Sequence, residues 1–242
     1  MRTPIKRNHL PGGLLALLCL LPLPALAATV AQKPEAALKE AFPQLQVDKV
    51  VPSDIKGLYE VSSGNNIFLY YPEKDYLFVG EVYAKGGRAL IAEKKRELSE
   101  KMVAKLPLDK AVKIGSGKKT VIEFTDPDCP YCRKLSDYLK NRTDITRYVF
   151  FAPLAHPGAM PKIQFILNAE DKPKAYSEMM AGTGAVPANA VFPDVVKALA
   201  QEHMNLAKSV GVTGTPTLFI GGKQVVGADF QKIDQLLQDE QK

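Results

Sequence analysis

The sequence has few cysteines and few histidines, and the scarcity of cysteine excludes a small domain held together by several disulfides. Of its 242 residues, three are Cys and three are His. A small exported domain held together by disulfides carries several spaced cysteine pairs, whereas here Cys129 and Cys132 stand two residues apart. A disulfide between them closes a loop too short to remove much entropy from the unfolded chain. A disulfide between these two cysteines would therefore add little to the stability of the fold, which argues against a purely structural role.

No apolar run of the chain is long enough to span a bilayer unaided. The run Leu14–Leu21 is well short of the roughly 20 residues that a spanning helix needs. Basic residues precede this run, and Ala25-Leu26-Ala27 follows it as a small-residue cleavage site. We therefore expect residues 1–27 to be a cleavable signal peptide that carries the chain out of the cytoplasm. An uncleaved anchor is the alternative.

The net charge also changes when this segment is removed. The chain has 32 basic and 26 acidic residues, and three of the basic ones lie in the segment, so the remainder carries 29 against 26, or +3. The two signs are interleaved along the chain, whereas nucleic-acid-binding faces concentrate Lys and Arg. We predict no nucleic-acid partner.

A zinc site is the main alternative for a Cys-x-x-Cys pair, and it needs two further ligands at suitable spacing. Beyond the signal peptide the only other soft ligands are His156 and His203. They are far more widely separated than the roughly three to five residues typical of a structural site. The sequence therefore predicts no metal, and no cofactor apart from the redox-active disulfide of the pair itself.

Residues 28–87 are expected to form a small module with one helix on an antiparallel sheet. A helical apolar face over 34–42 ends at Pro43, and four strand-like segments follow, separated by turn-forming residues. The strands are expected at Val47–Val51, Leu58–Val61, Ile67–Tyr71 and Tyr76–Tyr83. A unit of about 60 residues buries little apolar area. It therefore pairs with a second copy or docks onto the rest of its own chain, and the pattern leaves both open.

Residues 88–110 are expected to be a linker, and residues 111–242 a second domain. The linker helix is dense in Lys, Arg and Glu, has only a thin apolar stripe, and stops at Pro107. The second domain has an α/β pattern with a largely helical stretch at about 160–210. Its other elements are expected at Thr120–Phe124, Cys129–Lys140, Ile145–Phe151, Thr217–Ile220, Gln224–Val226 and Phe230–Gln238. The first two strands, Thr120–Phe124 and Ile145–Phe151, are expected to be parallel.

The motif Cys129-Pro130-Tyr131-Cys132 carries the chemistry. A Cys at the start of a helix lies against unpaired N–H groups and the positive end of the helix dipole, and both stabilise a thiolate. We assign Cys129 as the attacking thiol and Cys132, one turn further in, as the resolving thiol. Pro130 suits the first helical turn. Two acids oppose the thiolate and two bases favour it: Asp126, Asp128, Arg133 and Lys134.

The segment from Glu123 to Cys132, together with Gly214-Thr215-Pro216-Thr217, resembles the bacterial periplasmic disulfide isomerases of the DsbC/DsbG family. The resemblance implies an α+β protein, with a cystatin-like N-terminal dimerisation domain and a thioredoxin-like catalytic domain with a helical insertion. It also implies a periplasmic homodimer that acts on misoxidised secreted proteins, with an inner-membrane thiol-transfer reductant of DsbD type as its partner.

The resemblance also assigns roles to individual residues. Pro216 matches the family's cis-proline loop, which lies against the cysteines, and Thr215 precedes it. Pro130, Tyr131, Thr215 and Pro216 are thus expected to contact substrate. The family's isomerase branch has a second disulfide whose positions are occupied here by Asn168 and Ala190, so that bond is absent and the chain looks more like the DsbG branch.

Glu123 stands six residues before Cys129, where related proteins carry a buried acid. It is a candidate proton relay to Cys132, and a surface glutamate on a half-exposed strand is the alternative. The apolar neighbours favour burial, and a buried carboxylate without a partner would titrate high.

Three functions remain open on this evidence. The first is a disulfide isomerase and reductase with chaperone activity. The second is a dithiol oxidase that donates its disulfide. The third is a chaperone or binding module, with reduction of sulfenic acids as a DsbG-like activity. Of the remaining features, His156 is expected to be a loop residue, and Met179 and Met180 are expected to pack in the core of the insertion.

Overall fold

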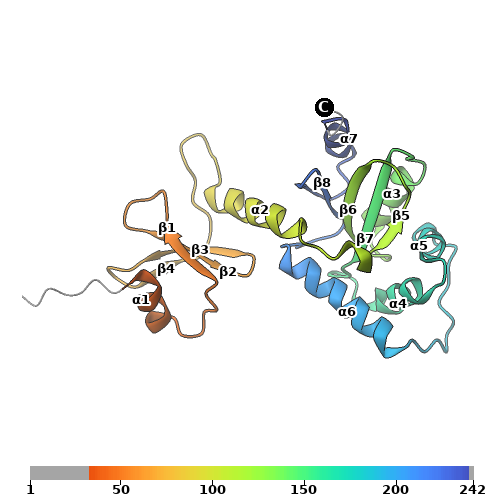
Figure 1. Cartoon of the computed structure of the whole chain (residues 1–242), viewed down its shortest axis with the longest axis horizontal. Coiled ribbons are helices and arrows are strands. Elements are labelled where there is room, and N and C mark those ends of the chain that lie inside the picture. The colour runs from red at the N-terminus through yellow and green to blue at the C-terminus, as the bar shows by residue number, and fades with distance from the viewer. Residues whose placement is uncertain (1–32, 240–242) are drawn as a thin grey trace, which may run out of the picture. The chain divides into compact units, whose positions relative to one another are not determined.

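The computed structural model describes residues 33–239 (Figure 1). The predicted signal peptide, residues 1–27, lies outside this range. Within it, no helix is both long and apolar enough to cross a membrane.

The N-terminal module consists of one helix and a four-stranded antiparallel sheet, as predicted. Helix α1 (Pro34–Ala41) places Leu38 in a small core with Val61 and Tyr70, all fully buried. The strands pair in sequence order, β1-β2-β3-β4. Their bounds are β1 (Lys49–Pro52), β2 (Tyr59–Ser63), β3 (Asn66–Tyr71) and β4 (Tyr76–Phe78).

Strand β4 is much shorter than predicted. It ends at Phe78, because the chain turns away at Gly80, whose φ of 143° suits glycine alone. Tyr83 is not part of the strand, and makes only an isolated bridge to Ala89. The result is an edge strand followed by the exposed apolar side chains of Val79 and Tyr83. Exposed edges of this kind are prone to pair with another chain.

Helix α2 (Leu90–Val103) replaces the longer helix predicted from residue 88. Its first turn is capped from outside, because the Glu81 carboxylate accepts hydrogen bonds from the N–H groups of Ile91 (2.8 Å) and Ala92 (3.0 Å). Ile91 packs with residues of β3, whereas Val103, at the other end, packs in a core of the second domain. The two ends of α2 thus contribute to different cores.

The second domain has a five-stranded sheet of order β5-β7-β6-β8-β9, in which only β6 and β7 run parallel. The parallel pair and the β8–β9 hairpin were predicted, but β5 was not. It has three residues and pairs antiparallel with β7 at the edge. The bounds are β5 (Val112–Ile114), β6 (Lys119–Thr125), β7 (Ile145–Phe151), β8 (Thr217–Ile220) and β9 (Lys223–Val226).

Helices cover both faces of this sheet (Figure 1). The side chains of β6 alternate, so that Val121 packs among residues of α3 and α7, whereas Phe124 packs among residues of α6. The helices α4 and α5 form the predicted insertion together with α6, and Met179 and Met180 are buried in its core, as expected. The helices are α3 (Pro130–Leu139), α4 (Met160–Asn168), α5 (Lys172–Ala181), α6 (Asp194–Ser209) and α7 (Phe230–Asp239), with 3-10 turns at Leu108–Lys110 and Pro157–Ala159.

His203 is a buried polar residue that ties α6 to the sheet. Its Nδ1 accepts a hydrogen bond from the Phe151 N–H at 3.2 Å, and its Nε2 donates to the Lys110 carbonyl at 3.0 Å. Both ring nitrogens are therefore satisfied in the neutral form. Burial lowers the pKa of His203 to about 4.

Stability should therefore fall with acidification through His203. The folded state binds this proton only near pH 4, whereas the unfolded chain binds it near the ordinary value of 6.5. The contribution is intact above pH 6.5 and is lost as the pH falls toward 4, by about 3 kcal/mol in total. We expect His203→Gln to flatten the dependence of the free energy of unfolding on pH between 7 and about 4. Urea titrations across that range measure it, and an unchanged slope would contradict the assignment.

Candidate functional site

Cys129 is the N-cap residue of α3, and Pro130 begins the helix, as the motif predicted. The Cys129 N–H donates to the Asp126 carbonyl at 3.1 Å, and the Cys129 carbonyl accepts from the Arg133 N–H at 3.1 Å. These bonds hold the sulfur at the end of the helix where the dipole favours a thiolate. Cys129 is 5% exposed and Cys132 is fully buried, so the predicted order of burial is confirmed.

The loop before β8 lies directly against the attacking thiol. The peptide bond between Thr215 and Pro216 is cis, as the family resemblance implied. The Cys129 thiol donates a hydrogen bond to the Thr215 carbonyl, with Sγ and O 3.4 Å apart. Tyr131, by contrast, is 62% exposed and carries Lys134 Nζ 5.7 Å from its ring centroid. The structure thus brings Thr215 to the motif and leaves the Tyr131 ring facing solvent.

The two acids that flank the motif are both paired. Asp128 forms ion pairs with Lys162 and with Arg133, and Arg133 also donates to the Pro127 carbonyl at 2.7 Å. The charge of Asp128 is therefore offset locally by two cations.

The expectation that His156 is only a loop residue is incomplete. Its Nδ1 lies 2.7 Å from Oδ2 of Asp126, which is fully buried. The other oxygen of Asp126 accepts from the Asp128 N–H at 2.9 Å. His156 is thus joined to the loop that carries the cysteines, and its side chain is 40% exposed.

Cys132 lies in an apolar environment that opposes ionisation. It belongs to a core cluster with Ile163, Met179 and Met180 of the insertion. Burial raises the pKa of the Cys132 thiol well above its ordinary value, while the Thr125 hydroxyl and the Asp126 N–H act in the opposite direction. Cys132 therefore remains protonated until something in the reaction favours its thiolate.

Glu123 is buried, as its apolar neighbours suggested, and it has polar partners. Its Oε2 accepts from Arg147 Nη2 at 2.6 Å and Nε at 3.1 Å, and its Oε1 accepts from the Tyr176 hydroxyl at 3.2 Å. Arg147 also donates to the Tyr176 oxygen at 2.8 Å. Both carboxylate oxygens are thus engaged by Arg147 and Tyr176, and no hydrogen bond between Glu123 and Cys132 within residues 33–239 supports the relay.

Glu123, Arg147 and Tyr176 form a buried triad that keeps the Arg147 guanidinium charged. Burial opposes the charge, but the Glu123 carboxylate and the Tyr176 hydroxyl more than offset it, so that the pKa of the guanidinium lies above its ordinary value. Sequence reasoning did not identify Arg147, although a lone Arg within the apolar strand Ile145–Phe151 is a usable signal. A buried charge needs a partner, and Glu123 on the neighbouring strand supplies one.

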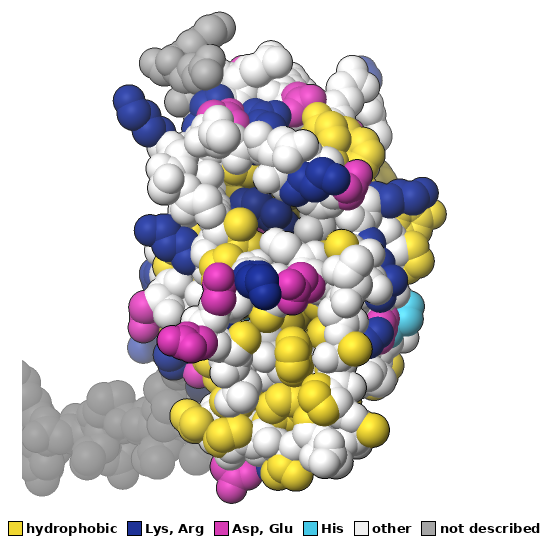
Figure 2. All heavy atoms as spheres, turned by 90° about the vertical axis from the view of Figure 1, so that its right-hand side faces the viewer, with side chains coloured by type: hydrophobic (Ala, Val, Ile, Leu, Met, Phe, Trp, Pro, Cys, Tyr) yellow, Lys and Arg dark blue, Asp and Glu magenta, His cyan; other side chains and the backbone are white. Residues whose placement is uncertain are grey.

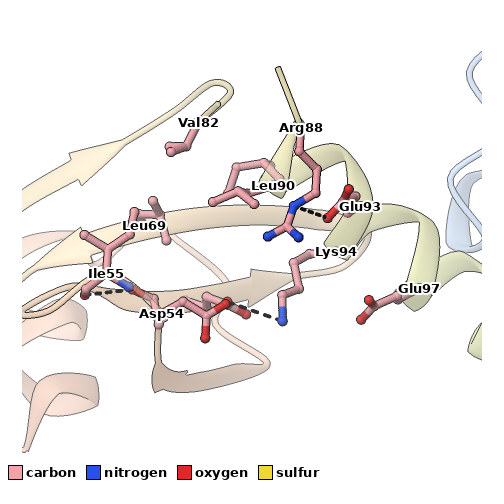
Figure 3. Close-up of a pocket in the computed structure, with 12 residues that line it drawn as sticks. Asp54, Ile55, Leu69, Val82, Arg88, Leu90, Glu93, Lys94 and Glu97 are labelled. Atoms are coloured by element: carbon pink, nitrogen blue, oxygen red, sulfur yellow. Dashed lines mark hydrogen bonds and ion pairs between the residues drawn. The ribbon is translucent and has the colours of Figure 1, made fainter. Parts of the chain in front are cut away.

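A separate pocket lies in the N-terminal module, between the sheet and the start of α2 (Figure 3). Leu69, Val82 and Leu90 supply apolar walls, and the rim carries ion pairs from Arg88 to Glu93 and from Lys94 to Glu60. No cysteine or histidine lines this pocket. It has none of the nucleophiles that the motif places at α3.

Charged side chains of both signs are interleaved on the face of the molecule shown in Figure 2, and hydrophobic side chains gather in its lower part. This face shows no single-sign field of the kind that nucleic-acid-binding proteins present.

Two family models match the chain. The model of a thioredoxin-like domain matches residues 106–241, which include both cysteines and the cis-proline loop. The model described as the disulfide bond isomerase protein N-terminal domain matches residues 25–92. Together they span the two sheets described above.

Similar proteins are disulfide-exchange proteins of several bacteria. A probable thiol:disulfide interchange protein DsbC of Bordetella avium is 34% identical over 74% of this chain and 63% of its own length. The chain thus spans less than two thirds of that relative. DsbC of Salmonella typhimurium is 28% identical over 84% of this chain and 86% of its own length. A disulfide interchange protein from Neisseria gonorrhoeae is 32% identical with a TM-score of 0.50, over 57% of this chain and 99% of that structure.

Proposed function

The chain belongs to the DsbC/DsbG family of thiol:disulfide interchange proteins, and on this premise we propose that it is a periplasmic disulfide isomerase and reductase of misoxidised secreted proteins. The contact of the Cys129 thiol with the Thr215 carbonyl, at the N-terminus of α3, carries the proposal. It places the nucleophile beside backbone that can pair with an extended client segment.

The reaction proceeds by thiol–disulfide exchange. Cys129, as the thiolate, attacks one sulfur of a client disulfide; a mixed disulfide forms, and the other client sulfur leaves as a thiolate that takes up a proton. The freed client thiol, ionised again, can attack a different client disulfide, and the client thiolate displaced there attacks the mixed disulfide and releases Cys129, so that the client is rearranged with no net oxidation or reduction. Alternatively, Cys132 attacks Cys129, which releases the client reduced and leaves the pair oxidised. A thiol-transfer reductant of DsbD type at the inner membrane would then restore the dithiol.

We further propose that the protein works as a homodimer joined through its N-terminal module. The match to an isomerase N-terminal domain supports this, as does the exposed apolar edge at Phe78, Val79 and Tyr83. Chaperone activity is part of the same proposal. Exposed Tyr131 and Leu154 offer apolar surface on the motif and on the segment before His156.

A refolding assay tests the function. Catalytic amounts of the reduced protein should restore the activity of an enzyme whose several disulfides have been scrambled, and light scattering on the same sample should give the mass of two chains. Protein alkylated at Cys129 serves as the control: it should restore nothing, yet still slow aggregation of a cysteine-free client. If only the oxidised protein assists, by forming disulfides in a reduced client, the chain is a dithiol oxidase and the proposal is wrong.

A further inference from the structure

Thr125 carries a buried hydroxyl that makes no well-formed hydrogen bond. It is the last residue of β6, fully buried, and its carbonyl accepts from the Ala152 N–H at 2.8 Å. Its backbone is therefore satisfied, while Oγ1 is the one buried side-chain nitrogen or oxygen within residues 33–239 that makes no well-formed hydrogen bond. Leaving a buried hydroxyl unpaired is unfavourable. Valine has the same shape without this cost, so the hydroxyl calls for an explanation.

Thr125 stands directly before Asp126, whose carbonyl accepts from the Cys129 N–H at 3.1 Å, and its hydroxyl acts on the Cys132 sulfur. The contact holds down the pKa of the Cys132 thiol against the effect of burial, and the Asp126 N–H acts on the same sulfur in the same direction. Cys132 is fully buried and packs among apolar side chains of the insertion, so water cannot solvate a charge there. Glu123, the other candidate for assisting this thiol, has both oxygens engaged by Arg147 and Tyr176.

We propose that Thr125 is a catalytic hydrogen-bond donor to the Cys132 thiolate, in the step in which Cys132 resolves a mixed disulfide on Cys129. In the dithiol form the sulfur is neutral and accepts only weakly, which agrees with the absence of a well-formed bond at Oγ1. The bond strengthens when the sulfur becomes negative, because hydrogen bonds to ionised groups are the strong ones. A donor already in place where charge develops lowers the barrier without reorganisation.

Resolution of the mixed disulfide by Cys132 is part of the proposed exchange chemistry, and this inference rests on that proposal. As the proton of Cys132 passes toward the departing partner sulfur, the developing thiolate, held by the Thr125 hydroxyl and the Asp126 N–H, attacks Cys129 Sγ. The bond between Cys129 and its partner sulfur breaks as the Cys129–Cys132 bond forms. The partner leaves as a thiolate and takes up a proton. The partner disulfide has been reduced by two electrons, and the cysteine pair has been oxidised by two.

Oxidised glutathione provides a test that needs no protein client. It forms a mixed disulfide with Cys129, and rapid acid quenching with mass spectrometry counts the glutathione-bearing intermediate and the final oxidised pair. With Thr125→Val we expect formation of the intermediate to change by less than about threefold, and its resolution by Cys132 to slow about 10- to 100-fold, as for loss of a hydrogen bond to a charged group. Thr125→Ser keeps the hydroxyl and should restore resolution to near the wild-type rate.

Thr146→Val is the matched control, because Thr146 is another largely buried threonine of the same domain whose hydroxyl donates to the Gly117 carbonyl at 2.6 Å. It should leave the ratio of the two rates unchanged. If Thr125→Val does not fold, Thr125→Ala removes the same hydroxyl with a smaller side chain. Equal slowing of both steps, or no slowing of resolution, would overturn the proposal. If glutathione reacts as expected but scrambled clients are not rescued, the proposed function fails while this assignment stands.

Discussion

Changing Cys132 to Ala will turn the protein into a covalent trap for its clients, whereas changing Cys129 to Ala will abolish its exchange with disulfides. Cys129 is the thiol at the end of α3 that lies against the Thr215 carbonyl, and Cys132 is fully buried behind it. Without Cys132, the mixed disulfide on Cys129 loses the intramolecular thiol that resolves it. Without Cys129, the remaining thiol is neutral at physiological pH and inaccessible to a client.

Non-reducing electrophoresis after acid quenching measures both results. The Cys132→Ala protein should accumulate client adducts that disappear on reduction, and the Cys129→Ala protein should form none above the uncatalysed background. The double variant is the control for adducts formed without either thiol. Adducts on Cys129→Ala as abundant as those on Cys132→Ala would reverse the assignment of the two cysteines.

Breaking the buried ion pair of Glu123 and Arg147 should cost the fold about 3–5 kcal/mol. Arg147→Met leaves the Glu123 carboxylate buried without its cation, and Glu123→Leu leaves the guanidinium in the same position. Each single variant therefore retains an uncompensated charge in the core. The double variant Glu123→Leu/Arg147→Met removes both charges and should recover much of the loss, since apolar replacements of a buried pair are often neutral.

Urea unfolding of the three variants gives these free energies. The exposed pair of Lys140 and Asp137, 2.6 Å apart, is the matched control. Lys140→Ala should change the free energy of unfolding by less than about 1 kcal/mol, because solvent screens such pairs. Single variants that unfold within about 1 kcal/mol of the wild type would show that the triad contributes little to stability.

The elements with strong local patterns could be predicted from the sequence. A short apolar run located β6, the helix signal placed Cys129 at the start of α3, and the parallel order of β6 and β7 followed from the crossover between them. Elements without such a pattern were missed or given wrong bounds in the prediction. Strand β5 has only three residues, and β4 stops early because Gly80 turns the chain, although apolar residues continue to Tyr83.

The parts of the site that depend on tertiary contacts could not be predicted in the same way. The partner of Glu123 comes from the next strand and from α5, so its pairing with Arg147 and Tyr176 needs three elements to be packed first. The contact between His156 and Asp126 joins residues 30 positions apart. Thr125 gives no signal at all, because threonine is ordinary in a strand. Only its burial and the sulfur beside it make its hydroxyl unusual.

The 5% exposure of Cys129 has a consequence for which molecules can react with it. A sulfur recessed between the end of a helix and a loop cannot be reached by a disulfide fixed within a rigid, folded surface. A chain that is still pliable can thread one of its sulfurs into the recess. If the chain is the proposed isomerase, we expect this geometry to favour disulfides of incompletely folded clients over disulfides fixed in folded proteins.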